Sequence, residues 1–172
     1  MRKSTRKKPV SKRILTFIIG IIIIIIQMSL TNFIGFRNIS VNFLLIYTVY
    51  IALYNDKFKS SLYGAVFGLT KDFLTGGVFG VCGLSLFIIS YLISYYRNMI
   101  YRESQYLVGI ITFLATIIYN VLDVFSVYVM YNTYSAFTLI VKGVLVLPVL
   151  NGVIASVIYI FLKKHIEKLG ED

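Results

Sequence analysis

Several residue types that build catalytic or metal-binding sites are nearly missing from this chain of 172 residues. It has one cysteine, Cys82, one histidine, His165, and no tryptophan. A single cysteine excludes an intramolecular disulfide, and a single histidine excludes a His-rich metal site. The phosphate-binding loop, the serine nucleophile elbow, the zinc-protease helix and the Gly-x-Gly-Asp motif of intramembrane aspartyl proteases are also absent. We therefore expect no catalytic residues, no metal, no cofactor and no enzymatic activity.

Charge is also scarce, because charged residues make up 14% of the chain against 58% hydrophobic residues. The apolar residues come in long blocks. A membrane-spanning helix needs about 20 mainly apolar residues to cross roughly 30 Å of hydrocarbon, and irregular backbone cannot face lipid because its amides would stay unpaired. The composition therefore predicts an all-α integral membrane protein.

Hydropathy breaks at short polar or glycine-containing stretches and predicts about six transmembrane helices. Their expected ranges are 14–33, 41–54, 60–75, 81–96, 106–130 and 136–162. The second to fourth are short for a full span. Either they extend through polar flanks, or the pair around Gly76, Gly77 and Gly80 bends or re-enters before the far side. No linker, repeat or soluble domain is visible, so residues 1–172 are expected to form a single multi-pass membrane domain.

A basic tail at residues 1–13 precedes the first apolar block. Its charges are Arg2, Lys3, Arg6, Lys7, Lys8, Lys12 and Arg13. Beside an apolar run, such a block is first a topology signal that keeps the tail in the cytoplasm, and second a patch for anionic lipids worth about 1 kcal/mol per charge. Nucleic acid is not an expected partner. No small-residue cleavage site follows, so we expect an uncleaved first helix.

The other basic residues agree with a cytoplasmic start. With six crossings, 14 of the 17 Lys and Arg residues fall on the inner side, Arg37 alone lies in an outer loop, and two lie within helices. This bias follows the positive-inside rule and predicts that both termini, including a tail at 163–172, are cytoplasmic. Because tryptophan is absent, we expect tyrosines near helix ends, Tyr47, Tyr50 and Tyr54 among them, to anchor the protein at the interfaces.

Glycines recur at four-residue steps in the third expected helix. Such a step places side chains on one stripe, where glycines let a second helix approach closely. The stripe and the turn that follows it include Gly64, Gly68, Asp72, Gly76, Gly80 and Gly83. The pattern predicts a surface for helix packing within the protein or for a partner or ligand.

Ionisable residues in hydrocarbon cost several kcal/mol unless they are paired, hydrated or near an interface. The four here, Lys71, Asp72, Asp123 and Lys142, are expected in the outer third of the membrane. We expect Asp72 and Asp123 to face the bundle interior and to share Lys142 as counter-ion, while Lys71 extends outward. The alternative is that each extends separately to the interface. Asn120, one turn before Asp123, would extend this polar network.

Pro148 is expected in the middle of the last helix. There it would remove a backbone hydrogen bond and kink the helix. Asn151, three residues later, is a candidate to satisfy the freed carbonyl. The kink would be either a structural feature or a hinge for a moving part.

The order of motifs resembles one protein family. The pattern G-x-x-x-G-L-x-x-D-x-L runs from Gly64 to Leu74, a glycine turn and G-x-x-G-L follow at 80–84, and Leu-Pro-x-Leu-Asn occurs at 147–151. Together they resemble the rod shape-determining protein MreD family. The resemblance covers most of the chain in helix order and length, and its specific part is residues 43–92. Family members often carry a proline where this chain has Val41.

This resemblance implies a non-enzymatic subunit of the cell-elongation (rod) complex in the bacterial cytoplasmic (inner) membrane. The subunit would bind the single-span protein MreC and, directly or indirectly, the cell-wall synthases, and would support lateral peptidoglycan synthesis and cell shape. The family's helix arrangement is also thought to be similar to that of the substrate-binding subunits of energy-coupling-factor vitamin transporters. Such a subunit is the alternative function, although the small-x-x-x-small docking motif of those subunits is absent from 21–26.

Overall fold

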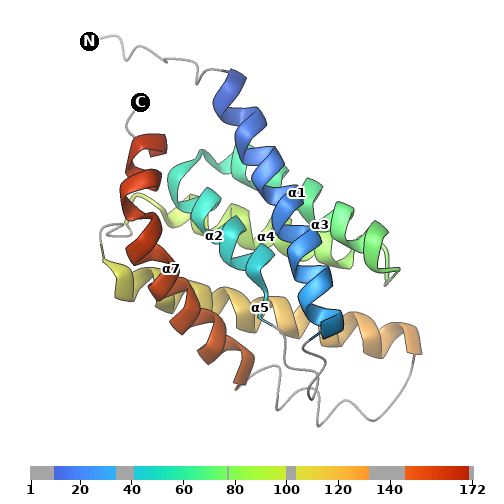
Figure 1. Ribbon diagram of the computed structural model, residues 1–172. Coiled ribbons are helices and arrows are strands. Elements are labelled where there is room, and N and C mark those ends of the chain that lie inside the picture. The colour runs from blue at the N-terminus through green and yellow to red at the C-terminus, as the bar shows by residue number, and fades with distance from the viewer. Residues whose placement is uncertain (1–9, 34–40, 77, 100–103, 132–145, 171–172) are drawn as a thin grey trace.

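Every element of the described chain is a helix. The computed structural model describes residues 10–33, 41–76, 78–99, 104–131 and 146–170 (Figure 1). Its elements are α1 (Val10–Phe33), α2 (Phe43–Tyr54), α3 (Lys57–Thr75), α4 (Val81–Tyr96), α5 (Gln105–Tyr131) and α7 (Leu147–Gly170). The prediction of an all-helical fold is confirmed.

The helix ends agree with the expected ranges most closely in the middle of the chain. At the two ends the helices run further than expected, because α1 already begins at Val10 and α7 continues to Gly170. Both therefore enter the segments predicted as tails. Residues 136–145, expected to begin the last helix, lie outside the described residues.

Local sequence accounts for the ends of the central helices. The side chain of Asn42 caps α2 by accepting a hydrogen bond from the amide of Leu45. Helix α3 ends at Gly76, whose φ of +65° is a left-handed conformation that glycine adopts without steric cost. Gly80, with φ of +93°, directly precedes α4 in a second such conformation.

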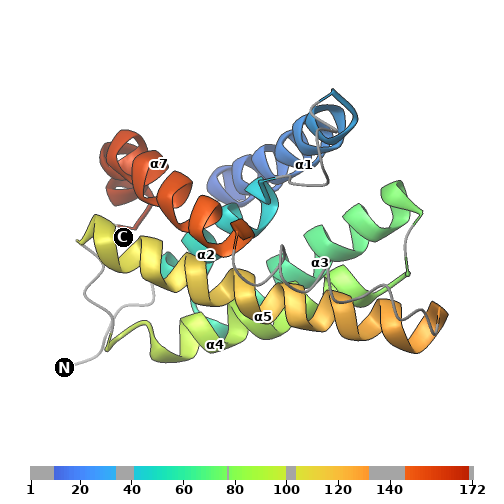
Figure 2. The same cartoon turned by 90° about the horizontal axis from the view of Figure 1, so that it is seen from below.

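The short helix α2 is the centre of the bundle. It packs against all five other described helices, and its residues from 44 to 53 are buried except Tyr47. The most extensive contacts join α3 to α4 and α5 to α7. Within the described residues, the main contacts of α1 are with α2 and α3. Figure 2 shows α1 and α7 on one side of the bundle and α4 and α5 on the other.

The first turn of α1 and the last turn of α7 lie at the same end of the bundle (Figure 1). The connection from α2 to α3 lies near that end as well, and the turn from α3 to α4 lies at the opposite end. Successive helices therefore alternate in direction.

Within the described residues, one helix is long and apolar enough by itself to cross a membrane, at Tyr106–Ser126 in α5. Four shorter apolar segments accompany it, at Ile14–Ser29, Phe43–Tyr54, Val81–Tyr96 and Leu147–Tyr159. Helix α3 contributes none, because it begins with Lys57 and Lys59 and carries Lys71 and Asp72 near its end.

Among the described residues, the bundle buries polar side chains beside its hydrophobic core and exposes large apolar side chains on its surface. Twelve polar or charged residues are buried, among them Thr112, Thr116 and Asn151, whereas the exposed surface is rich in large apolar side chains such as Ile22 and Ile110. An apolar exterior around hydrogen-bonded polar side chains suits a bundle surrounded by lipid, where water does not compete for polar groups.

Candidate functional site

Helices α3 and α4 are held together by glycines. A Cβ atom on Gly64 would lie 2.6 Å from the carbonyl oxygen of Leu86, and one on Gly68 would lie 2.5 Å from the Cα atom of Gly83. Both neighbours are backbone atoms that cannot move aside. Three members of the predicted stripe thus serve close packing between α3 and α4, which occupies that face of α3.

The remaining two glycines of the stripe have a different role. Space is open around Gly76 and Gly80, with no atom within 4 Å of an added Cβ. Their positive φ angles are what require glycine, since other residues adopt this region only with strain. They shape the turn and do not contribute to the packing surface.

Helices α3 and α4 and the turn between them form a hairpin, the α3–α4 hairpin, and Asp72 connects its two helices. It is 7% exposed, and its Oδ2 atom accepts hydrogen bonds from the amides of Gly80 at 3.0 Å and Gly83 at 3.2 Å. These amides belong to the start of α4, where the unpaired N–H groups and the helix dipole favour a negative charge. Asp72 therefore caps α4 from the end of α3.

This cap was not expected from the sequence. Asp72 does face the interior, as predicted, but its described partners are backbone amides, and the expected counter-ion Lys142 lies outside the described residues. The sequence does contain a signal, because an aspartate precedes two glycines by eight and eleven positions. This signal can be interpreted only once the geometry of the turn is known.

Lys71 is half-buried and directs its amine toward α5, so the expectation that it extends outward is wrong. Its Nζ atom donates a hydrogen bond to the hydroxyl of Tyr119 at 3.2 Å and lies 5.4 Å from the centre of that ring. The Tyr119 hydroxyl donates in turn to the sulfur of Cys82 at 3.4 Å. This chain of contacts joins α3, α5 and α4 at one level.

Asp123 stands one turn beyond Tyr119 on α5. At 100° per residue it lies on the same side of α5 as the buried residues Thr116 and Tyr119, yet it is exposed at this end of the helix. The charges of Lys71 and Asp72 both act on its carboxylate. Asn120, predicted to belong to this network, is 9% exposed. The pairing of Asp123 with Lys142 stays a prediction.

A second polar cluster joins four helices at the start of α2. The side chain of Gln27 accepts a hydrogen bond from the amide of Leu44 and donates one to Asn42. Asn151 accepts from the backbone amide of Asn42 at 3.1 Å and donates to the hydroxyl of Thr116 at 3.3 Å. This cluster could not be predicted from the sequence, because hydropathy does not show which buried polar groups meet.

Asn151 thus bonds to neighbouring helices, and the carbonyl that Pro148 would free, four residues before it, lies outside the described residues. Since residues 132–145 are outside the described ranges, the kink stays a prediction.

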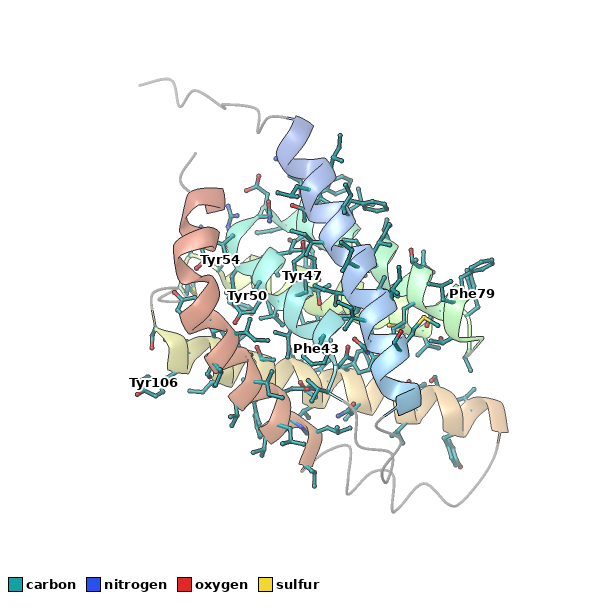
Figure 3. The ribbon with its side chains drawn as sticks, viewed as in Figure 1. Phe43, Tyr47, Tyr50, Tyr54, Phe79 and Tyr106 are labelled. Atoms are coloured by element: carbon teal, nitrogen blue, oxygen red, sulfur yellow. The ribbon has the colours of Figure 1, made fainter. Side chains whose placement is uncertain are left out.

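Two tyrosines of α2, Tyr47 and Tyr50, make interior contacts and are not interface anchors. Tyr47 donates to the carbonyl of Thr16 at 2.8 Å, and Tyr50, which is 6% exposed, donates to the carbonyl of Ala155. In Figure 3, Tyr47 and Tyr50 lie between α1 and α7. They attach α2 to the first and last helices.

An all-helical bundle with hydrogen-bonded polar side chains inside and apolar side chains outside is a helical membrane protein. The sequence of this chain matches the family model of the rod shape-determining protein MreD over residues 11–169. The chain therefore belongs to the MreD family, whose members are bacterial membrane proteins that determine rod shape. The comparisons with curated proteins and with solved structures find no match.

Proposed function

We propose that this protein is a non-enzymatic membrane subunit of the bacterial cell-elongation complex, and that it binds an MreC-like single-span protein and supports lateral peptidoglycan synthesis. The observation that carries the proposal is the family match over residues 11–169. The role as a membrane subunit agrees with the described fold, in which the described helices pack into one bundle.

The proposed topology places about six helices in the inner membrane, with both termini in the cytoplasm. Two observations support it. The first turn of α1 and the last turn of α7 lie at one end of the bundle (Figure 1), and the Lys and Arg residues of the connections gather at that end, as Lys57, Lys59 and Arg97 do. The basic tail at 1–13 would then contact anionic lipids of the inner leaflet.

The partner surface is proposed to lie away from the glycine hairpin. The face of α3 that carries Gly64 and Gly68 is already filled by α4, so these glycines position the hairpin and leave other faces for a partner.

Depletion of the protein in its own rod-shaped cell tests the proposal. Rounding or swelling of the cells is expected, together with co-purification of a single-span protein that has a large external domain. Cells that keep their shape and width after depletion would contradict it. A thermal-shift screen with vitamins tests the alternative, since only a transporter subunit should be stabilised by a small molecule.

A further inference from the structure

The turn between α3 and α4 exposes apolar side chains where an external loop would present polar ones. Phe73 is 78% exposed and Phe79 is 67% exposed. Phe79 projects away from the bundle at the tip of the hairpin (Figure 3). No charged residue occurs between Asp72 and Arg97. Two exposed phenylalanines are unfavourable for a turn in water and favourable for one in hydrocarbon.

The contact with α5 gives the depth of this turn. The apolar stretch Tyr106–Ser126 of α5 continues for seven residues beyond Tyr119, which is about 10 Å at 1.5 Å per residue. The Tyr119 hydroxyl contacts Cys82 in the first turn of α4 and Lys71 in the last turns of α3. The outer end of the hairpin is therefore level with the interior of the α5 span and not with its edge.

The length of the hairpin agrees with this depth. Asp56, just before α3, accepts a hydrogen bond from Arg97, just after α4, at 2.7 Å, and Lys57 stacks on Tyr95 at 4.0 Å. These charges hold the inner end at the membrane surface. From there the 19 residues of α3 extend about 28 Å and the 16 residues of α4 about 24 Å, both short of the roughly 30 Å of a hydrocarbon core.

Irregular backbone inside a membrane must have its polar groups satisfied by the protein. The turn meets this condition at several positions. The amide of Gly76 bonds to the carbonyl of Asp72, and that of Val81 bonds to the carbonyl of Val78. The amides of Gly80 and Gly83 bond to the Asp72 carboxylate. In water, these two amides would not need a buried carboxylate.

We propose that the α3–α4 hairpin enters the membrane from the cytoplasmic side and turns within the outer leaflet, where lipid acyl chains contact Phe73 and Phe79. The proposal goes beyond the function in cell elongation and rests only on the orientation of α5 proposed above. In this arrangement the start of α4 lies in hydrocarbon. The Asp72 carboxylate then accepts the hydrogen bonds of the Gly80 and Gly83 amides that water would otherwise accept.

Single-tryptophan variants of the full chain in lipid nanodiscs test the proposal, because the protein contains no tryptophan of its own. Phe79→Trp and Phe73→Trp should be quenched strongly by lipids brominated on their acyl chains. The matched control is Met99→Trp, on the connection after α4, where the native side chain is 86% exposed. Iodide in the buffer should quench Met99→Trp several-fold more than either hairpin variant.

Equal iodide quenching of Phe79→Trp and Met99→Trp, without quenching by brominated acyl chains, would overturn the proposal by placing the turn in water. Leu84→Trp, at a side chain that is 58% exposed in the first turn of α4, reports the same depth independently of the turn itself. If the tryptophan of Met99→Trp is shielded from iodide, the connection after α4 does not lie at the membrane surface. That result would contradict the proposed orientation of the helices, and this proposal with it. Loss of cell shape on depletion tests the function separately.

Discussion

The side-chain carbonyl of Asn151 accepts a hydrogen bond from the backbone amide of Asn42 at 3.1 Å, between residues 109 positions apart. Asn151 is 1% exposed and also donates to Thr116. One amide side chain in α7 thus satisfies the start of α2 and contacts α5. In a bundle surrounded by lipid, no water is available to replace either bond.

Replacing Asn151 by leucine should therefore destabilise the protein. Asn151→Leu keeps the branching of the side chain, although leucine is larger, and leaves the Asn42 amide without this acceptor, which should lower the free energy of unfolding by about 1–3 kcal/mol. Unfolding by SDS in mixed micelles measures it. Val149→Ala, on the exposed side of the same helix turn, is the control and should change stability little. Equal stability of the two variants would mean that the hydrogen bond contributes nothing.

Removing the carboxylate of Asp72 should weaken the hairpin. Asp72→Ala deprives the amides of Gly80 and Gly83 of their acceptor, and we expect a loss of about 1–3 kcal/mol. Asp72→Asn keeps one acceptor oxygen but loses the charge that favours the start of α4, so its loss should be smaller. The same SDS titration compares both with Thr75→Ala, an exposed position nearby. An Asp72→Ala protein as stable as Thr75→Ala would refute the cap.

Hydropathy was enough to predict most of the fold. Helices α2 to α5 lie within a few residues of their expected ranges, because apolar blocks end where Asn55, Gly76 or Arg97 makes a longer helix unfavourable. The glycine stripe also predicted close helix packing. These features are local along the chain, so a single sequence contains them.

The position of a side chain around the bundle could not be predicted in the same way. Tyr47 and Lys71 were placed by their depth, and depth does not show whether a residue faces lipid or another helix. The partners of Asp72 were missed for a related reason. They are backbone amides, which become available only because Gly76 and Gly80 direct the chain back toward α3.

A methyl group at Gly68 should disrupt the contact between α3 and α4. Gly68→Ala would place its Cβ 2.5 Å from the Cα of Gly83, so the two helices must separate, and we expect a loss of about 1–3 kcal/mol. Gly76→Asn is the matched control, because space is open there and asparagine tolerates a positive φ. Its loss should be smaller. If Gly68→Ala unfolds at the same SDS fraction as the native protein, the close approach is not required.

The counter-ion of Asp123 can be identified with double-mutant cycles. Lys71 is the described lysine whose charge acts on Asp123, and Lys142 is the one predicted from the sequence. Asp123→Ala is combined with Lys71→Ala in one cycle and with Lys142→Ala in the other. Paired residues should show a coupling of about 0.5–3 kcal/mol in the unfolding free energy. We expect coupling in at least one cycle, and full additivity in both would exclude any pairing of Asp123.

The inner end of the hairpin should depend weakly on pH through Asp56. Partial burial raises the pKa of this carboxyl, but the hydrogen bond and charge of Arg97, together with Lys59, outweigh it and hold the pKa below its ordinary value of 3.8. Since the folded pKa is the lower one, the stabilisation is complete above 3.8 and is lost as the pH falls through the folded value. Its size should not exceed about 1 kcal/mol, because the side chain of Asp56 is 63% exposed.

Comparing the stability of the native protein with that of Asp56→Asn at several pH values checks the predicted direction of the pH dependence. The native protein should be slightly more stable at pH 7, and the difference should narrow as the pH falls below 3.8. Arg97→Gln should remove most of the same difference, because Arg97 lies 2.7 Å from Asp56. Lys59→Gln should remove less, because the Lys59 amine is 3.5 Å away. A difference between native and Asp56→Asn proteins that is constant from pH 7 to acid would show that the ion pair does not stabilise the hairpin.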